Sequence, residues 1–419
     1  MTDTAAPLSN WARNVTYGAT RLHRPATLDE VCRTVAGSVR IRALGTGHSF
    51  SLVGDTTAEL IRLDRMPRTV AIDAAAGVVH VSAGTSYAHL AGELHRVGFA
   101  LPNLASLPHI SVAGSCATGT HGSGATLRCL ASAVRAVHLV GADGQVVEFD
   151  RDGQPDTFPG TVVALGALGI VTRLTLDIEP AYEVAQRVLV DVPLDEIQAN
   201  LDAVFAAAYS VSVFTSWRGG RANVFLKRRT DRPAGDWTAG RPATVPVHPV
   251  PEQPAANCTT QLDRPGPWHE RLPHFRPEYV PGSGRELQTE YFVPREHGAA
   301  AIGALRRLGD LMAPVLQISE LRAVRGDDLW LSPAYGRDTV ALHFTWVDDL
   351  PAVLPVIGAV EARLGPLGPR PHWGKLTLMS PGEILDRYPR AADFAKLGAT
   401  LDPAGKFGNA FVEALFPPS

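Results

Sequence analysis

The segment 44-LGTGHSF-50 holds the residues of this chain that first suggest chemistry. Gly45 and Gly47 flank a threonine, and His48 and Ser49 follow at once. Glycines this close together are typical of a tight turn or of a backbone that a ligand approaches closely. The segment alone favours a tight turn with a half-buried histidine. A reactive group, a metal ligand or a phosphate loop needs support from elsewhere in the sequence.

Several familiar motifs fail at this segment. A serine-hydrolase elbow needs a glycine where Ser51 stands. A zinc site needs further ligands at helix or hairpin spacing, and the fourteen histidines contain no H-x-x-x-H or H-E-x-x-H pair. No G-K-[ST] follows, which excludes a P-loop, and no third glycine completes the usual dinucleotide fingerprint. We therefore expect no metal site here.

Two further glycine-rich stretches change this interpretation. The stretch 101-LPNLASLPHISVAGSCATGTHGSG-124 combines four glycines with many serines and threonines, and 164-ALGALGIVT-172 places Gly166 and Gly169 just before a strand. Small side chains let backbone N–H groups converge on an anion. A flexible linker is the alternative, but linkers rarely interleave so many leucines, isoleucines and valines. Three such loops favour a large phosphate-bearing cofactor.

The elements around these loops predict an α+β fold. Residues 39-VRIRAL-44 alternate as a half-buried strand leading into the first loop, and 77–84 and 170–180 also read as strands. Residues 133–150 predict a hairpin that turns at Gly144, and Ser86 predicts the start of a helix that continues through Val97.

The pattern changes after Tyr182. Helices are expected over 194–208 and 297–312, and strands over 211–217, 222–228, 287–294 and 338–347. The proline- and glycine-rich segment 230–257 between them reads as a surface excursion or a lid.

The totals restrict the class of protein and its surroundings. The chain has 419 residues, enough for two or three domains, and its net charge of −3 argues against nucleic-acid binding. We find neither a signal peptide nor an apolar run near 18 residues, and so expect no membrane span. The four cysteines are far apart and form no C-x-x-C pair, as expected of reduced thiols. We expect a cytoplasmic monomer.

Taken together, GTGHSF, ASLPHISVAGSCATGTHGSG, LGALGIVT, HWGK and 402-DPAGKFGNAFV-412 resemble the vanillyl-alcohol oxidase (p-cresol methylhydroxylase-type) family of FAD-linked oxidases, in its sugar- and polyol-oxidising branch. The resemblance runs nearly end to end. It implies a two-domain fold, with residues 1–182 and 376–419 forming the FAD-binding domain and 183–375 an α+β cap domain. It also implies that His48 bonds covalently to FAD.

The resemblance assigns the remaining cofactor contacts residue by residue. The pyrophosphate and flavin are expected near Ala43, Leu44, Gly45, Thr46, Gly47, Ser49, Ser106, Ser111, Gly114, Thr118, Gly119, Thr120, His121, Gly169, Ile170, His372 and Asn409. Some relatives add a cysteinyl bond to the flavin, but that cysteine aligns near Leu107. Cys116 lies deeper in the loop and is interpreted as a packing residue, so we expect a single histidyl attachment.

The resemblance also implies the reaction. Glu320 and Arg322 stand two apart on an expected strand and so face the same side, an arrangement that also fits a surface ion pair. With Ser106, Thr345 and Lys375 they form a polar set suited to a polyol. The implied reaction is hydride transfer from C1 of an alditol, such as xylitol or sorbitol, to flavin N5, with O2 reduced to H2O2.

In this reaction Lys375, assisted by Arg322 and Glu320, would take or stabilise the hydroxyl proton. Burial beside Arg322 would lower the pKa of Lys375 for that task. The adjacent His343 is interpreted as a packed core histidine. The alternatives are an aldonolactone oxidase or a sugar dehydrogenase on the same fold, and a non-catalytic FAD- or sugar-binding protein.

Overall fold

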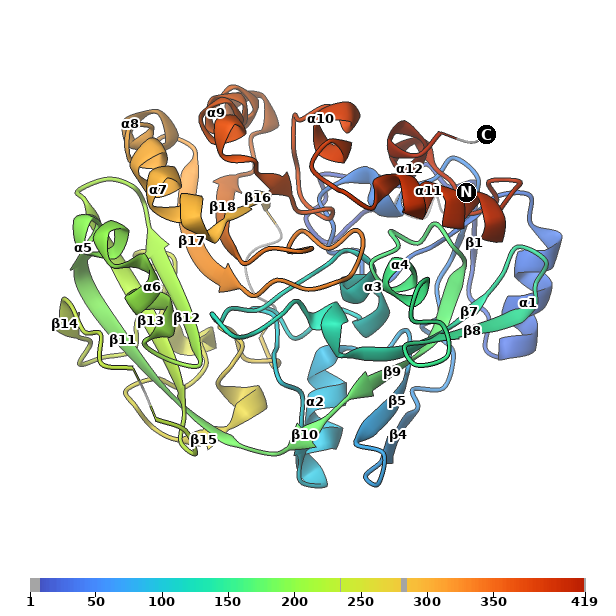
Figure 1. The fold of residues 1–419 in the computed structure, drawn as a ribbon, viewed down its shortest axis with the longest axis horizontal. Coiled ribbons are helices and arrows are strands. Elements are labelled where there is room, and N and C mark those ends of the chain that lie inside the picture. Colours follow the sequence, from blue (N-terminus) through green and yellow to red (C-terminus); the bar gives the residue numbers. More distant parts are fainter. Residues whose placement is uncertain (1–7, 234, 280–284, 418–419) are drawn as a thin grey trace, which may run out of the picture.

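The structure is a computed structural model that describes residues 8–233, 235–279 and 285–417. The first seven residues of the amino-terminal segment, part of the 1–182 unit, lie outside the described residues, as do the last two of the 376–419 unit and one residue of the proline-rich excursion. Figure 1 shows two sheet-containing regions side by side, with the carboxyl-terminal helices returning to the region where the chain begins.

Two sheets form the amino-terminal region. Parallel strands in the order β1-β3-β2 make the smaller one, and an antiparallel sheet in the order β4-β5-β9-β7-β8 makes the larger. A short antiparallel pair joins β6 to β10. The strands are β1 (Arg21–His23), β2 (Ile41–Ala43), β3 (Glu59–Ile61), β4 (Val70–Asp73), β5 (Val78–Ser82), β6 (Phe99–Ala100), β7 (Val134–Val140), β8 (Val146–Asp150), β9 (Ile170–Asp177) and β10 (Glu179–Pro180).

Four helices accompany these strands: α1 (Leu28–Gly37), α2 (Tyr87–Arg96), α3 (Val112–Ala117) and α4 (Phe158–Val162). Helix α2 confirms the expected cap, because the Ser86 side chain accepts a hydrogen bond from the His89 N–H. Gly98, at a φ of +84°, follows the helix end. Leu90 and Leu94 are buried as expected, but Val97 is exposed.

The chain after Tyr182 builds one large antiparallel sheet. Within the described residues its strands follow the order β14-β11-β13-β12-β17-β18-β16-β19, with β15 paired to β11. The strands are β11 (Glu183–Pro193), β12 (Ser210–Thr215), β13 (Arg221–Arg229), β14 (Arg241–Pro242), β15 (Gly266–Pro267), β16 (Glu286–Pro294), β17 (Leu316–Val324), β18 (Thr339–Val347) and β19 (Arg370–Pro371).

Helices cover one face of the large sheet. They are α5 (Leu194–Ala199), α6 (Leu201–Ala206), α7 (Gly298–Arg306), α8 (Gly309–Met312) and α9 (Leu350–Leu364). Leu321 and Ala323 of β17 join their apolar side chains, whereas Glu320 and Arg322 point to the opposite face. The strand's period of two therefore separates a packed face from a polar one.

The carboxyl-terminal segment packs against the amino-terminal region. Helices α10 (Pro381–Leu385), α11 (Ala391–Leu401) and α12 (Ala410–Leu415) lie beyond the large sheet in sequence. Phe394 and Val412 share a core with Val79 of β5, and the Ile41 N–H donates to the Lys406 carbonyl at 2.9 Å. This return agrees with a unit built from both ends of the chain (Figure 1).

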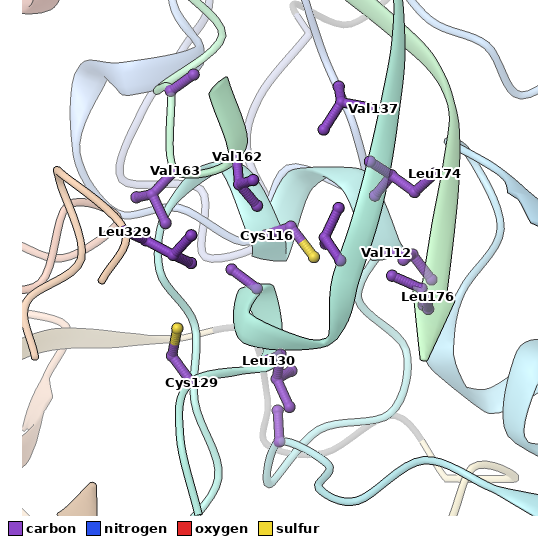
Figure 2. Close-up of a cluster of buried hydrophobic side chains, with 14 of the residues drawn as sticks. Val112, Cys116, Cys129, Leu130, Val137, Val162, Val163, Leu174, Leu176 and Leu329 are labelled. Carbon is purple, nitrogen blue, oxygen red and sulfur yellow. The ribbon is translucent and has the colours of Figure 1, made fainter. Parts of the chain in front are cut away.

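The amino-terminal core also contains two cysteines. Cys116 lies among Val112, Val137 and Leu174, and Cys129 lies beside Leu130 (Figure 2). Burial raises the pKa of the Cys116 thiol to about 12, and Cys116 does not line the large cavity described below. Its packing role is therefore confirmed. All four cysteines are free thiols.

Three expectations about local structure need correction. The helices expected over 194–208 and 297–312 are each divided, at Asn200 and near Leu308. In the strand expected over 39–44, Val39 is 86% exposed while Arg42 is buried. Alternation failed there because the Arg42 guanidinium donates to buried backbone carbonyls, which compensate the cost of burying its charge.

The sequence also contains a longer apolar segment than expected. Residues Leu350–Leu367 have a mean hydropathy of 1.3 over 18 residues, enough by length and composition to cross a membrane. Val353, Ile357 and Val360 of this segment pack into the core against the large sheet. A core helix of a globular domain passes the same test, so the segment is weak evidence for a span.

Candidate active site

A cavity of about 700 Å³ lies between the glycine loops of the amino-terminal region and the polar face of the large sheet. One wall comes from the segments around residues 43–50, 105–121 and 165–171. The other comes from β16, β17, β18 and the segment 372–375. Most of the expected cofactor residues and all of the expected substrate residues therefore meet in one space, although they are far apart in sequence.

The first glycine loop, residues 43–49, forms one end of the cavity. All seven residues line it, immediately after β2. Gly47 has a φ of +71°, a conformation that glycine adopts without strain. The loop is fixed from both sides, because the Trp11 N–H donates to the Gly47 carbonyl and the Phe50 N–H to the Gly374 carbonyl, each at 2.7 Å.

His48 lies in the cavity wall with its ring held on two sides. The indole of Trp11 stacks on the imidazole, with centroids 5.5 Å apart, and Thr46 Oγ1 lies 3.0 Å from His48 Nδ1. Burial, followed by the charges of His109 and Lys375, lowers the pKa of His48 to about 4. The imidazole is therefore neutral at physiological pH and has a nitrogen lone pair.

The second glycine-rich loop lies beside the first. Ser106, Ser111, Gly114, Thr118, Thr120 and His121 all line the cavity. The Ser111 N–H donates to Thr46 Oγ1 at 3.3 Å, and a Cβ on Gly45 would lie 2.6 Å from Ser111 Oγ. A larger residue at position 45 would therefore displace the Ser111 hydroxyl where the two loops pass each other. Gly119 faces away, toward Pro333, and does not line the cavity.

Two other expected cofactor residues also lie outside the cavity wall. Gly169 lines the cavity, but Ile170 is fully buried in a separate core with Ile41 and Phe407. Asn409 uses its Oδ1 to accept from the Val412 N–H as the cap of α12, and its amide N–H groups donate to carbonyls of residues 52, 53 and 55. Its side chain therefore supports the fold.

The expected substrate residues form the opposite wall. Glu320 and Arg322 lie on β17, Thr345 lies on β18, and Lys375 follows β19, and all four line the cavity. Arg322 Nε is 3.6 Å from Glu320 Oε2, and Arg322 Nη1 donates to Ser106 Oγ at 3.4 Å. The Glu320–Arg322 pair is therefore a buried pair inside the site.

A buried carboxylate that the sequence analysis missed lies at the centre of this wall. Glu290 of β16 accepts from Arg322 Nη2 at 2.5 Å and lies 3.1 Å from His121 Nε2. His343 Nδ1 lies 3.6 Å from the same carboxylate, so His343 faces the cavity and is no simple core residue. The sequence did contain a signal for this carboxylate. Gln288 and Glu290 stand two apart on the expected strand 287–294 and so share one face, as Glu320 and Arg322 do on theirs.

Lys375 and His372 complete the polar wall. The Lys375 ammonium donates to Gln288 Oε1, and its nitrogen lies 5.3 Å from the centre of the Phe50 ring. Burial lowers the pKa of Lys375 to about 8, and Arg322 adds to the effect while Glu290 opposes it. His372 Nδ1 accepts from the Gly374 N–H at 3.0 Å, and burial holds the pKa of His372 well below its usual value.

The proline-rich excursion closes part of the cavity. His248, Pro249, Val250, Gln253 and Asn257 line it beside Phe275 and His274. This agrees with a lid over the site better than with a linker. Among the residues that the structure describes, no group of three or more His, Cys, Asp or Glu side chains could hold a metal ion.

The glycine-loop wall fits the FAD that the sequence resemblance implies. Within the described part of the chain, the backbone N–H groups of residues 45–49 donate to no protein acceptor. Five successive N–H groups beside a cavity form a concave donor site for an anion such as a pyrophosphate. The same cavity is lined by this loop and by the polar wall of the large sheet, and its volume of about 700 Å³ gives room for a large ligand.

Comparisons with known proteins agree with this site. Residues 20–150 match the family described as FAD binding domain, and residues 284–415 match D-arabinono-1,4-lactone oxidase. The chain is 52% identical to alditol oxidase of Streptomyces sp. (strain IKD472 / FERM P-14339), over 97% of this chain and 98% of that protein. It is 26% identical to mouse L-gulonolactone oxidase, over 97% of each chain.

A solved structure supports the fold. Cholesterol oxidase from Brevibacterium sterolicum superposes with a TM-score of 0.79, at 13% identity, over 98% of this chain and 96% of that chain. The fold and site thus define an FAD-dependent oxidoreductase of the p-cresol methylhydroxylase type. Within that class, the chain belongs to the family that contains alditol oxidase and, at lower identity, the aldonolactone oxidases.

Proposed function

We propose that this protein oxidises the terminal C1 hydroxyl of an alditol, such as xylitol or sorbitol, to the aldose. The observation that carries the proposal is the polar wall of β16, β17, β18 and Lys375, which faces the glycine-loop wall across one cavity. The 52% identity to an alditol oxidase over nearly the whole chain supports the same substrate class.

The glycine loops would hold FAD. The N–H groups of residues 45–49 would bind the pyrophosphate, and the neutral His48 imidazole would attach the flavin covalently. Bound FAD would supply the hydride acceptor and return the electrons to O2 as H2O2. Residues 1–182 and 376–419 would form the FAD-binding unit, and 183–375 the cap.

The opposite wall would recognise the hydroxyls of the polyol. Arg322 presents donors only, the Glu320 carboxylate presents acceptors only, and Thr345 and Ser106 can do both. Buried groups of this kind discriminate strongly against analogues that lack the matching hydroxyl, because the protein group would then lose its partner. An extended polyol fits this mixture of donors and acceptors, because each of its hydroxyls can both donate and accept a hydrogen bond.

Lys375 would accept the proton of the C1 hydroxyl. A base must be unprotonated when it acts, and the pKa of Lys375, lowered to about 8 by burial, makes its neutral form accessible near physiological pH. Arg322 would stabilise the developing negative charge on the same oxygen while Glu290 holds the guanidinium in place.

The free cysteines agree with a reducing compartment, so we also propose that the enzyme works in the cytoplasm, and as a monomer. The decisive experiment is anaerobic mixing of purified holoenzyme with xylitol, followed by air. Bleaching of the flavin absorption and then one H2O2 per xylitol oxidised would support the proposal. Bleaching by gulonolactone but not by xylitol would assign the aldonolactone oxidase function, and no bleaching by either would reject both activities.

A further inference from the structure

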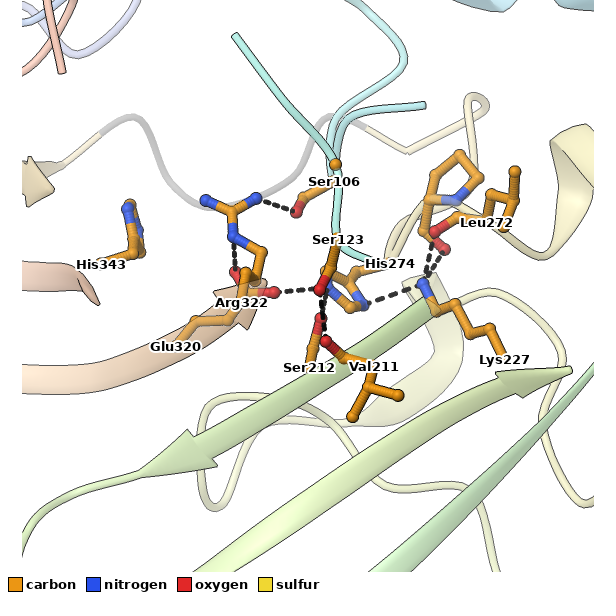
Figure 3. Close-up of polar contacts among 12 residues, drawn as sticks. Ser106, Ser123, Val211, Ser212, Lys227, Leu272, His274, Glu320, Arg322 and His343 are labelled. Carbon is orange, nitrogen blue, oxygen red and sulfur yellow. Dashed lines mark hydrogen bonds and ion pairs between the residues drawn. The ribbon is translucent and has the colours of Figure 1, made fainter. Parts of the chain in front are cut away.

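A buried chain of polar groups lies behind Glu320. His274 Nε2 is 2.9 Å from Glu320 Oε1, and His274 Nδ1 is 3.2 Å from Lys227 Nζ (Figure 3). Lys227, on β13, is only 1% exposed and does not line the cavity. Lysine is almost never buried so completely unless its charge has partners. An apolar side chain would be expected at so buried a position, so the presence of Lys227 indicates that its polar contacts have a role.

The N–H groups of the Lys227 ammonium determine which atom donates and which accepts in each of these hydrogen bonds. Its ammonium carries three N–H groups, and three acceptors surround it: the Leu272 carbonyl, the Pro273 carbonyl at 3.2 Å, and His274 Nδ1. A charged lysine only donates, so His274 Nδ1 must accept. The proton of the neutral imidazole is then on Nε2, which donates to Glu320 Oε1.

The surroundings of His274 hold its ring in this arrangement. Phe214 and Phe225 pack edge-on against the imidazole, with centroids 5.2 and 5.9 Å away. Ser212 Oγ is 3.4 Å from the same Nε2 and is a weaker contact than Glu320. Burial, followed by the charge of Lys227, lowers the pKa of His274 to about 4, and so His274 stays neutral.

The charges that face Lys227 and Glu320 agree with this assignment. Burial lowers the pKa of Lys227 to about 7, Glu320 and Cys258 oppose that effect, and Arg322 adds to it, so the charged, donor-only form of Lys227 is the main form below about pH 7. Burial acts to raise the pKa of Glu320, but Arg322, His274 and His343 together outweigh it, so the carboxyl stays ionised. With His274 at Oε1 and Arg322 at Oε2, the position of both carboxylate oxygens is defined.

We propose that Lys227 and His274 are positioning residues, which hold Glu320 as an ionised acceptor for one hydroxyl of the substrate. The inference rests on the polyol oxidase function proposed above. Neither residue is expected to take part in hydride transfer. They make the site selective for a substrate that donates a hydrogen bond at Glu320, and an analogue without that hydroxyl leaves an acceptor position of the carboxylate unfilled.

The first test reads the tautomer of His274 without using the reaction. Holoenzyme labelled with 15N-histidine is measured by NMR at about pH 6, where Lys227 is charged and His274 is neutral, with His274→Gln to assign the resonance. The proposal expects a neutral ring with the proton on Nε2. A protonated ring, or a proton on Nδ1, would overturn it. This outcome is independent of whether a polyol is the substrate.

The second test uses steady-state kinetics with xylitol. Glutamine at position 274 can accept from Lys227 and donate to Glu320, whereas leucine can do neither. We therefore expect His274→Leu and Lys227→Met to raise KM by about tenfold, with kcat changing less, and His274→Gln to keep KM within about threefold. Flavin content and Tm of each variant report whether it folds.

A deoxy analogue of xylitol provides the specificity measurement. The parent should prefer xylitol strongly over the pentitol that lacks the hydroxyl bound at Glu320, and His274→Leu should lose most of that preference. Equal KM values in His274→Gln and His274→Leu, with normal flavin content in both, would overturn the proposal. If His274→Leu does not fold, Lys227→Met and the NMR measurement decide.

Discussion

The indole ring of Trp11 stacks on the imidazole of His48, with an angle of 18° between the two planes. The contact joins the amino-terminal segment to the glycine loop that follows β2. It covers one face of the histidine and leaves its edge in the cavity wall. Together with the contact of Thr46 Oγ1 at Nδ1, it holds the ring in the cavity wall, where the proposed bond to FAD would form.

The first prediction concerns that bond. His48→Ala should still fold, because His48 is only half-buried, but its flavin should be released into the supernatant on acid precipitation. The parent and the matched variant Ser49→Ala should keep the flavin in the pellet. The measurement is the absorption spectrum of both fractions. Flavin that stays with the His48→Ala pellet would contradict the covalent role of His48.

The second prediction concerns the pH dependence of flavin reduction. The rate constant for anaerobic reduction by xylitol should rise with pH through about 8, where Lys375 loses its proton, and then level off. Lys375→Met should reduce this rate constant by at least 100-fold and leave the bound flavin unchanged. The exposed Lys396 on α11 offers the control Lys396→Met, which should behave like the parent. A Lys375→Met variant with the parental rate would contradict the role.

The sequence predicted the parts of the site that local patterns specify. The glycine loops, the cap of α2 and the shared face of Glu320 and Arg322 all follow from turn chemistry or strand period, and each is present. The resemblance added Lys375, Thr345 and Ser106, which line the cavity together. Cys116 lies in the core as expected.

The missed features depend on contacts between distant segments. Glu290 and His274 enter the site only because β16 pairs with β18 and the 271–276 segment packs behind β17, which no single strand pattern contains. The alternating strand pattern predicted that Arg42 is exposed. The pattern could not show its buried carbonyl partners, because these lie as far away in the sequence as Phe407. The side chain of Asn409, expected near the flavin, caps α12, a contact that the sequence analysis did not include.

The third prediction follows from Arg42. Its guanidinium donates to the carbonyls of Val53, Leu165, Gly166 and Phe407, and so joins the glycine loops to the carboxyl-terminal segment. Arg42→Met would remove the arginine donors from these buried carbonyls, of which Val53 would keep a second donor in Asn409. We expect a loss of at least about 3 kcal/mol in unfolding free energy and poor flavin retention.

The matched control for this change is Arg40→Met on the same segment. Arg40 is partly exposed and pairs with Glu413, so its replacement should cost less than about 1 kcal/mol. The comparison is made by urea unfolding and by the flavin-to-protein absorbance ratio. Equal losses in the two variants would show that Arg42 does not join the loops.

The last prediction concerns Glu290, which Arg322 and His121 contact in the buried centre of the site. Burial acts to raise its pKa, but Arg322 and then His121 outweigh that effect, so the pKa lies well below its usual value. A lowered pKa means that the ionised carboxylate stabilises the fold above about pH 4 and that this contribution is lost as pH falls further.

Glu290→Gln keeps the shape of the side chain but leaves Arg322 with a weaker partner. We expect a loss of about 3–5 kcal/mol at pH 7, because the variant breaks a buried charge pair, and a smaller loss at about pH 3, where part of that contribution is already gone. Urea unfolding at both values measures it. Glu286→Gln on the same strand is the control, since burial raises the pKa of Glu286 and its charge gives no such stabilisation. A Glu290→Gln loss that does not change with pH would contradict the assigned ion pair.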